Sequence, residues 1–177
     1  MPIKIVVTGP ESTGKTTLCV QLSGRYKGTM IPEFSREYLK KTKGTYHLED
    51  IENIGLMQSS LNNEAGIDKK ISICDTDALT SYIWANEKYK VNSPALELAF
   101  KENLPDLYLL CYPDLKWEFD VLRESSGDLE RIFNRYLEEI VRIKAPYAII
   151  SGIGRSRTNK AFYFIDSRFP HLISFTV

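Results

Sequence analysis

The chain has 177 residues, which is the size of one domain and leaves no room for a second independent core. Apolar residues make up 43% and charged residues 26%, as in ordinary globular proteins, which excludes a disordered chain, a collagen-like repeat and a coiled coil. The 23 Lys and Arg residues balance the 23 Asp and Glu residues, so nucleic acid and anionic membranes are disfavoured as partners. We expect a single domain over residues 1–177.

The cysteines, the histidines and the lengths of the apolar runs exclude further classes of protein. The three cysteines form no CxxC pair and are odd in number, which argues against a disulfide framework or a zinc site and fits a reducing compartment. The two histidines lie outside any metalloprotease or serine-hydrolase motif. The longest apolar stretch, 107–112, is too short to span a membrane. We therefore expect a cytoplasmic protein.

Short apolar runs and helical periodicity alternate along the chain. The runs predict five buried strands, at residues 3–7, 30–31, 71–74, 107–112 and 147–150. Between and after them, apolar spacing predicts helices over 16–26, 35–41, 48–64, 79–86 and 158–168. Another helix is expected to begin at Ser93-Pro94, and a strongly amphipathic helix follows the polar stretch 123–128 and ends near residue 144. On the helix over 48–64 we expect one side to carry Ile51, Ile54, Met57, Ser60 and Leu61. This alternation predicts an α/β fold, with a parallel sheet covered by helices on both faces.

A Gly-rich loop follows the first predicted strand and opens the first helix. Its sequence, Gly9-Pro10-Glu11-Ser12-Thr13-Gly14-Lys15-Thr16, matches the Walker A pattern at every fixed position. Backbone N–H groups of such a loop cradle phosphates, Lys15 reaches the β- and γ-phosphates, and the Thr16 hydroxyl ligates Mg²⁺. We expect ATP to be bound by Gly9, Glu11, Ser12, Thr13, Gly14, Lys15, Thr16 and Thr17. The alternative is a Gly-rich turn that only connects two elements.

Carboxylates follow two other strands, at the edge where open parallel sheets bind ligands. Asp75 ends the third strand and is expected to hold Mg²⁺, directly or through water, in a catalytic role. Asp77 is a candidate for substrate binding, or it caps the next helix. Glu33 follows the second strand and can take the proton of a substrate hydroxyl, with Arg36 beside it as a substrate-binding residue. The alternatives are a solvated carboxylate and a surface cation, and the general base is either Glu33 or Asp75.

Seven of the nine arginines lie at or beyond residue 123. Arg123 and Arg131 flank a polar, hinge-like stretch, and phosphoryl transfer needs donors for the charge on the equatorial oxygens. We expect a lid at about 115–130 that carries both as catalytic residues, with a solvated charged face as the alternative. Arg157, after the fifth strand, is a candidate for bordering the adenine of the nucleotide.

Aromatic residues and one further tripeptide concern base recognition. Tyr82, Trp84 and Trp117 are candidates for stacking on a base, although aromatic residues at helical spacing more often pack in a core. The tripeptide Thr158-Asn159-Lys160 begins like the guanine-reading N-K-x-D element but lacks its Asp, which disfavours GTP.

In this order, the motifs resemble the NadR-like ribosylnicotinamide (nicotinamide riboside) kinase domains, a branch of the P-loop kinases. The resemblance rests on residues 9–16, Pro32-Glu33-Phe34-Ser35-Arg36-Glu37, Asp75-Thr76-Asp77, Trp117, Leu122-Arg123 through Gly127 to Arg131, and Phe133. It implies a three-layer P-loop NTPase fold with strand order 2-3-1-4-5 and a helical lid, ATP and Mg²⁺ as cosubstrates, and phosphorylation of the 5′-hydroxyl of the riboside. Pro32 stands where some members have Trp. Because the chain opens at the Walker strand, we expect any adenylyl transfer to come from another protein.

Two other functions stay open at this point. One is a P-loop ATPase that acts as a regulator or switch without phosphorylating an acceptor, and the other is a kinase for another nucleoside or a vitamin. Two acidic sites at the ligand edge favour a kinase with a small, nucleoside-like substrate, because a switch needs no carboxylate that binds an acceptor. Neutral overall charge disfavours a polynucleotide kinase.

Overall fold

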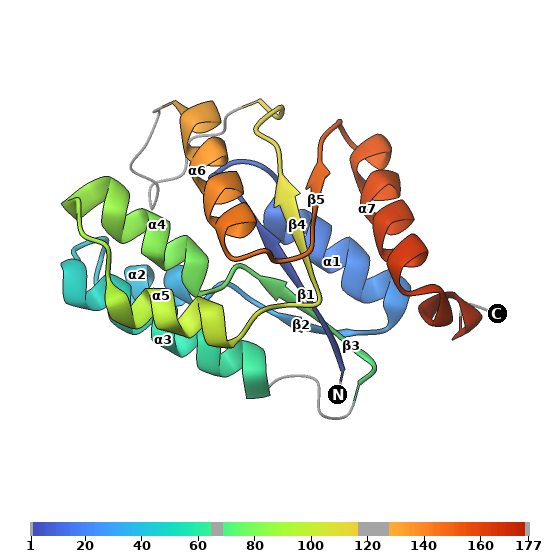
Figure 1. The fold of residues 1–177 in the computed structure, drawn as a ribbon, viewed down its shortest axis with the longest axis horizontal. Coiled ribbons are helices and arrows are strands. Elements are labelled where there is room, and N and C mark those ends of the chain that lie inside the picture. The colour runs from blue at the N-terminus through green and yellow to red at the C-terminus, as the bar shows by residue number, and fades with distance from the viewer. Residues whose placement is uncertain (1, 65–68, 117–127, 176–177) are drawn as a thin grey trace.

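The centre of the protein is a parallel sheet of five strands in the order β2-β3-β1-β4-β5 (Figure 1). The computed structural model describes residues 2–64, 69–116 and 128–175. The strands are β1 (Ile3–Thr8), β2 (Thr29–Ile31), β3 (Ile71–Asp75), β4 (Leu107–Cys111) and β5 (Tyr147–Ile150). All five agree with the predicted ranges to within one residue at either end, and the strand order is the one that the family resemblance implied.

Seven α-helices are described around this sheet, followed by a short 3₁₀ helix over Pro170–Phe175. They are α1 (Lys15–Tyr26), α2 (Phe34–Lys41), α3 (Leu48–Glu64), α4 (Ala78–Tyr89), α5 (Pro94–Glu102), α6 (Leu129–Arg142) and α7 (Arg155–Arg168). The predicted start of α5 is confirmed, because the Ser93 hydroxyl accepts a hydrogen bond from the Leu96 N–H (3.4 Å). α7 begins three residues before its predicted start. Gly154, with φ 57°, turns the chain directly into the helix, a conformation that apolar spacing does not reveal.

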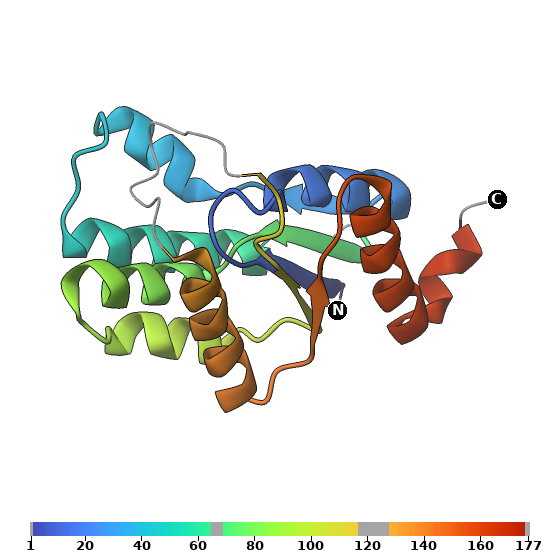
Figure 2. The same ribbon diagram turned by 90° about the horizontal axis from the view of Figure 1, so that it is seen from above.

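Side chains of each strand alternate between two apolar cores, one on each face of the sheet. Figure 2 shows the helices that lie over these two faces. On β1, Ile5 and Val7 pack with α1 and α7, whereas Val6 packs with α2 to α6 on the opposite face. Helices therefore cover both faces, as predicted. Among the described residues, no helix combines the length and the apolar character that crossing a membrane requires.

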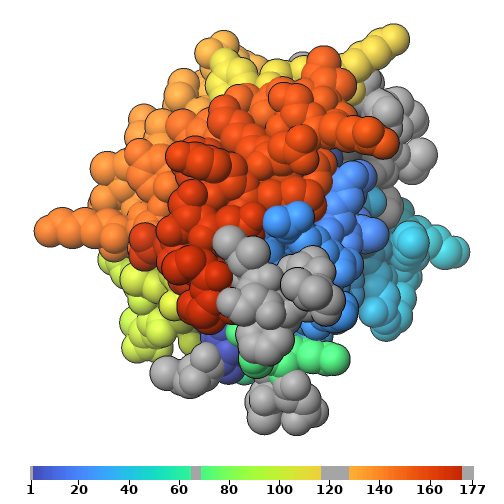
Figure 3. Space-filling model, turned by 90° about the vertical axis from the view of Figure 1, so that its right-hand side faces the viewer, coloured from blue at the N-terminus to red at the C-terminus, as the bar shows by residue number. Residues whose placement is uncertain are grey.

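α1 and α7 lie side by side on one face, which Figure 3 presents. The Arg25 guanidinium pairs with Asp166 (2.9 Å) and lies over the ring of Phe162, 4.4 Å from its centroid. The Tyr26 hydroxyl donates to the same aspartate at 2.7 Å. These contacts join the helix that follows the Gly-rich loop to the last α-helix of the chain.

The buried side of α3 differs from the predicted one. Ile51 is buried as expected, but Met57 is 47% exposed and Ser60 also faces solvent. Gln58 and Asn62 are buried in their place and hydrogen-bond to each other at 3.0 Å. Buried polar side chains are stable only when they are hydrogen-bonded. The partners of Gln58 and Asn62 lie on loops far away in the sequence, so apolar spacing alone cannot identify this buried side.

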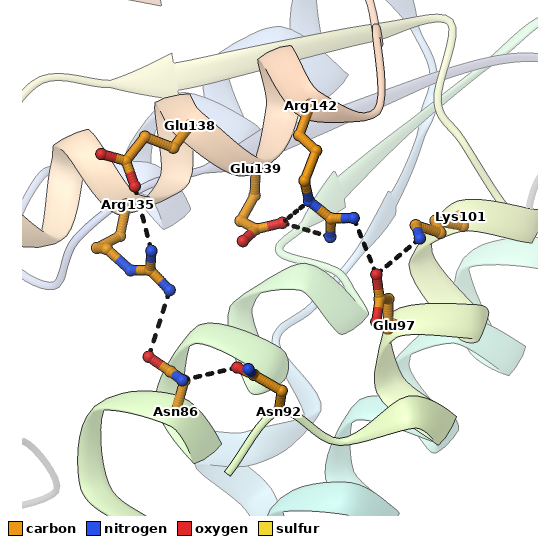
Figure 4. A network of polar contacts seen from close by, with 8 residues as sticks. All are labelled: Asn86, Asn92, Glu97, Lys101, Arg135, Glu138, Glu139 and Arg142. Carbon is orange, nitrogen blue, oxygen red and sulfur yellow. Dashed lines mark hydrogen bonds and ion pairs between the residues drawn. The ribbon is translucent and has the colours of Figure 1, made fainter. Parts of the chain in front are cut away.

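A network of charged and amide side chains joins α6 to α4 and α5 (Figure 4). The Glu97 carboxylate on α5 accepts from Lys101 (2.6 Å) and from Arg142 on α6 (2.9 Å). Arg135, also on α6, donates to Asn86 on α4 at 3.3 Å. All three side chains at Glu97 are partly exposed, so water screens their attraction and each pair stabilises the fold only slightly.

We expect the apolar core, rather than this network, to determine the stability of the helices beside it. Phe100 is 1% exposed and its ring contacts Tyr82, so Phe100→Ala should lower the free energy of unfolding by about 3–5 kcal/mol. Glu97→Gln, one helical turn away, should lower it by less than about 1 kcal/mol. Urea denaturation of both variants measures the two values, and a larger loss for Glu97→Gln would contradict this ranking.

Candidate active site

The Gly-rich loop leaves β1 and packs directly against the end of β4. Gly9 has φ 129°, and a Cβ atom added there would lie 2.7 Å from the carbonyl oxygen of Cys111, so only glycine fits. Within the loop, the Lys15 ammonium and the Thr13 hydroxyl both donate to the Pro10 carbonyl at 2.7 Å. The loop is thus held in one curled conformation at the start of α1, where backbone N–H groups and the helix dipole favour an anion.

A cavity of about 380 Å³ lies over this loop, within the size range of small-ligand sites. Its lining consists of Ser12, Thr13, Gly14, Lys15, Thr16, Thr17, Arg36, Leu115 and Lys116. Six of these are predicted nucleotide-binding residues, and Glu11 belongs to the same loop. The sequence did not indicate Lys116, which adds a second ammonium group to the lining.

Asp75 ends β3 beside the loop and faces the start of α1. Its Oδ2 accepts a hydrogen bond from the Thr16 hydroxyl at 2.6 Å, and the residue is only 1% exposed. Burial raises the pKa of Asp75, while the Thr16 hydroxyl and the Lys15 charge oppose that rise. Its Oδ1 is buried without a hydrogen-bond partner in the described chain. A carboxyl group with one unpartnered oxygen beside a threonine hydroxyl fits Mg²⁺, which prefers oxygen ligands and takes further ones from phosphates and water.

Thr76 separates the two aspartates by an unusual backbone conformation. Its φ is 73°, which is rare for a β-branched residue and costs free energy. Its N–H donates to the Val7 carbonyl (3.0 Å), and its own carbonyl accepts from the Asn62 amide (3.0 Å). The kink allows Asp75 to face the loop while Asp77 contacts other groups.

Asp77 lies at the N-cap position of α4, as the capping alternative required, but its side chain makes no capping hydrogen bond. Its Oδ2 instead accepts from the hydroxyl of Tyr108 on β4. Asp77 is 7% exposed, and burial raises its pKa to about 6, against the lowering effect of the Tyr108 hydrogen bond. No pattern in the sequence pointed to Tyr108, the second residue of an apolar strand.

Glu33 lies between β2 and α2 and turns toward the same edge of the sheet. Its carboxylate accepts from the Ser35 hydroxyl (2.7 Å) and from the Arg36 guanidinium (3.1 Å). The Glu33 charge contributes to the raised pKa of Asp75, so the two carboxylates lie close together. Gln58 of α3 fixes this loop, since its Oε1 accepts from the Phe34 N–H at 2.7 Å. The sequence pattern that could have indicated this contact is the presence of polar residues at core spacing on α3, which the apolar periodicity did not consider.

A small hollow of about 20 Å³ lies between these acidic residues and α4. It is lined by Glu33, Ser35, Ile54, Gln58, Thr76, Asp77, Thr80, Ser81 and Trp84. Among the described residues, the lining contains two carboxylates and an indole, and no Lys, Arg or His. Of the candidate stacking residues, Trp84 borders this hollow, Tyr82 packs against Phe100 in the core, and Trp117 lies outside the described residues.

Arg157 lies under the Gly-rich loop, in the first turn of α7, and is 5% exposed. Its guanidinium pairs with Asp114 (2.6 Å) and donates to the carbonyls of Thr13 (2.8 Å), Tyr112 (3.0 Å) and Gly152 (3.1 Å). One side chain thereby ties the loop to the segments that follow β4 and β5. A role at the adenine stays a prediction, and these contacts support positioning of the loop.

The lid arginines are only partly described. Arg123 lies outside the described residues, as do residues 117–127 of the predicted lid. Arg131 lies in the first turn of α6 and forms a two-point ion pair with Glu87 of α4, at 2.9 and 2.7 Å. The sequence does not indicate this partner, because Glu87 comes from another helix that only the tertiary fold brings close.

A parallel 2-3-1-4-5 sheet, a Walker A loop after β1 and a buried aspartate at the end of β3 define a P-loop NTPase fold of the kinase type. A family model described as AAA domain matches residues 4–157, and the chain belongs to this family. The trifunctional NAD biosynthesis/regulator protein NadR of Salmonella typhimurium is 24% identical over 144 residues, which are 78% of this chain and 35% of that protein.

Solved structures give the same fold. The NadR protein in complex with NR aligns with a TM-score of 0.83 and 19% identity, over 96% of this chain and 52% of that one. The deoxyadenosine kinase from M. mycoides with bound dATP aligns with a TM-score of 0.58 and 13% identity, over 93% of this chain and 99% of that one. The chain thus spans about a third of the curated NadR protein and about half of the NadR chain in the crystal.

We expect Arg157 to stabilise the fold more than any exposed arginine of the same helix. Arg157→Met leaves Asp114 and three carbonyls without their donor, so the free energy of unfolding should fall by about 3 kcal/mol. Arg155→Met, two residues earlier and exposed, is the matched control and should change it by less than about 0.5 kcal/mol. Urea denaturation measures both, and equal stability of the two variants would show that the guanidinium contacts contribute nothing.

Proposed function

We propose that the protein transfers the γ-phosphoryl group of ATP to a hydroxyl group of a small nucleoside, and that this nucleoside is nicotinamide riboside. The observation that carries the proposal is the arrangement of two cavities at one sheet edge. The larger one lies over the Walker loop and the acidic hollow lies near it, because Arg36 lines the first and its ion-pair partner Glu33 lines the second. The high structural similarity to a NadR protein in complex with NR supports this choice of acceptor.

In this proposal the loop amides and Lys15 bind the phosphates of ATP. Thr16 and Asp75 hold Mg²⁺, which neutralises phosphate charge when bound. Glu33 accepts the proton of the acceptor hydroxyl while that oxygen forms a bond to the γ-phosphorus. The bond between that phosphorus and the β,γ-bridging oxygen breaks, and ADP leaves. Ser35 and Arg36 hold both oxygens of the Glu33 carboxylate, which fixes the direction in which it takes the proton.

The charge of the acidic hollow supports a cationic acceptor. Nicotinamide riboside carries a permanent positive charge on its pyridinium ring, and the carboxylates of Glu33 and Asp77 in the hollow favour a cation bound beside it. Nicotinic acid riboside carries an additional carboxylate, and none of the described residues that line the hollow is a Lys, Arg or His that would pair with it. We therefore expect the amide form to be preferred. A P-loop switch without an acceptor gives no role to these two carboxylates.

The test is ATP-dependent turnover with a panel of nucleosides and vitamins, with the phosphorylated product identified by mass. Nicotinamide mononucleotide should form, and kcat/KM for nicotinamide riboside should exceed that for nicotinic acid riboside by about tenfold or more. ATP hydrolysis with no phosphorylated acceptor would favour the switch instead.

Two substitutions separate nucleotide binding from proton transfer. Lys15→Ala should abolish product formation, because it removes the point charge on the phosphates. Glu33→Gln should lower kcat by a factor of about 10²–10⁴ yet leave the affinity for ATP unchanged. Glu37→Gln, which changes an exposed carboxylate one turn into α2, is the control and should behave as wild type. Unchanged product formation by Glu33→Gln would remove its proposed role.

We also propose that Arg131 stabilises the transferring phosphoryl group, after its ion pair with Glu87 opens. Arg131→Ala should then lower kcat by a factor of about 10²–10³, with a much smaller effect on ATP affinity. Arg142→Ala, which removes an ion-paired arginine at the other end of α6, should leave kcat within twofold of wild type. If Arg131→Ala has as little effect as Arg142→Ala, Arg131 belongs to a solvated face.

A further inference from the structure

Tyr108 places a hydroxyl group inside an apolar core. The residue is 0% exposed near the start of β4, and the core that it joins includes Val6 and Cys74 on the same face of the sheet. A buried hydroxyl costs free energy unless it is hydrogen-bonded, and phenylalanine would fill the same space without that cost. The hydrogen bond that satisfies this hydroxyl goes to Asp77 Oδ2, across the intervening strand β1.

Asp77 presents its other oxygen without a partner. In the described chain, Oδ1 of Asp77 is buried and has no partner at hydrogen-bond geometry, although the backbone N–H groups of Leu79 and Thr80 at the start of α4 lie near enough to the carboxylate to lower its pKa. The residue also lines the acidic hollow. A buried carboxylate oxygen without a donor is unfavourable, so the site suits a ligand that brings one. The hollow holds about 20 Å³, which matches one hydroxyl group rather than a whole nucleoside.

We propose that Tyr108 is a positioning residue for acceptor recognition: it holds Oδ2 of Asp77, so that Oδ1 receives a hydrogen bond from a ribose hydroxyl of the nucleoside. The inference rests on the proposed function and assigns the acidic hollow to the sugar of the acceptor. A carboxylate rotates about its Cβ–Cγ bond in a broad energy well, and the Tyr108 hydroxyl fixes that rotation before the substrate arrives. Tyr108 itself contacts no substrate.

The expected signature is a change in acceptor KM alone. Tyr108→Phe should raise KM for nicotinamide riboside by about tenfold, because the hydrogen bond to an oriented carboxylate weakens. The KM for ATP and kcat at saturating riboside should stay within twofold of wild type. Tyr82→Phe is the matched control, since it removes a hydroxyl from another buried tyrosine of the same core that does not line the hollow. It should leave all three constants unchanged.

A double-mutant cycle separates positioning from a general loss of packing. Asp77→Asn should raise the riboside KM, and adding Tyr108→Phe to Asp77→Asn should raise it by less than twofold more, because both changes act on the same carboxyl group. Adding Tyr82→Phe to Asp77→Asn should also have no effect. A Tyr108→Phe variant with wild-type riboside KM, or an effect of equal size in both backgrounds, would overturn the inference.

The wild-type enzyme in the same assay distinguishes the two proposals. If wild type phosphorylates nicotinamide riboside and Tyr108→Phe does so with unchanged constants, the proposed function stands and the positioning role fails. If wild type phosphorylates a different riboside of the panel, the choice of nicotinamide riboside fails and the cycle is measured with that nucleoside. If it phosphorylates none, both proposals fail.

Discussion

The position of β1 between β3 and β4 is the constraint on which the site depends. Parallel pairing places Val7 opposite Asp75 on one side and Thr8 opposite Leu110 on the other. The Walker loop therefore leaves the sheet where β3 ends, and Thr16 comes within 2.6 Å of Asp75. A shift of one residue in the β1–β3 register would turn the aspartate to the other face of the sheet and separate the two oxygens.

Around this contact, buried polar groups fix the loops from two sides. Arg157 holds the Walker loop from the side of α7, through the Thr13 carbonyl. Gln58 and Asn62 hold the loops after β2 and β3 from the side of α3. Each of these groups satisfies backbone atoms that the curled loops leave without partners in a sheet or helix. The loops at the candidate site are thus ordered by side chains from other elements of the fold.

A strained backbone at Thr76 places the aspartates on either side of it in different surroundings. In regular extended backbone, alternate residues face the same side, so Asp75 and Asp77 would share one environment. Thr76, at φ 73°, breaks that alternation, so that Asp75 contacts Thr16 of the Walker loop while Asp77 lines the acidic hollow. Two hydrogen bonds offset the cost of this conformation: the Thr76 N–H donates to Val7, and the Thr76 carbonyl accepts from Asn62.

The sequence by itself determined the five strands, the Walker loop and the carboxylates at the strand ends, because hydrophobic periodicity and a fixed loop motif are local properties of the chain. It missed the polar side of α3, the start of α7 and the partners of Arg131 and Arg157. Only the tertiary structure decided that Tyr108 meets Asp77 and that Glu87 meets Arg131, because these pairs are 31 and 44 residues apart. Long-range hydrogen bonds leave no periodic trace in a sequence, since their geometry exists only once the sheet and its helices have packed.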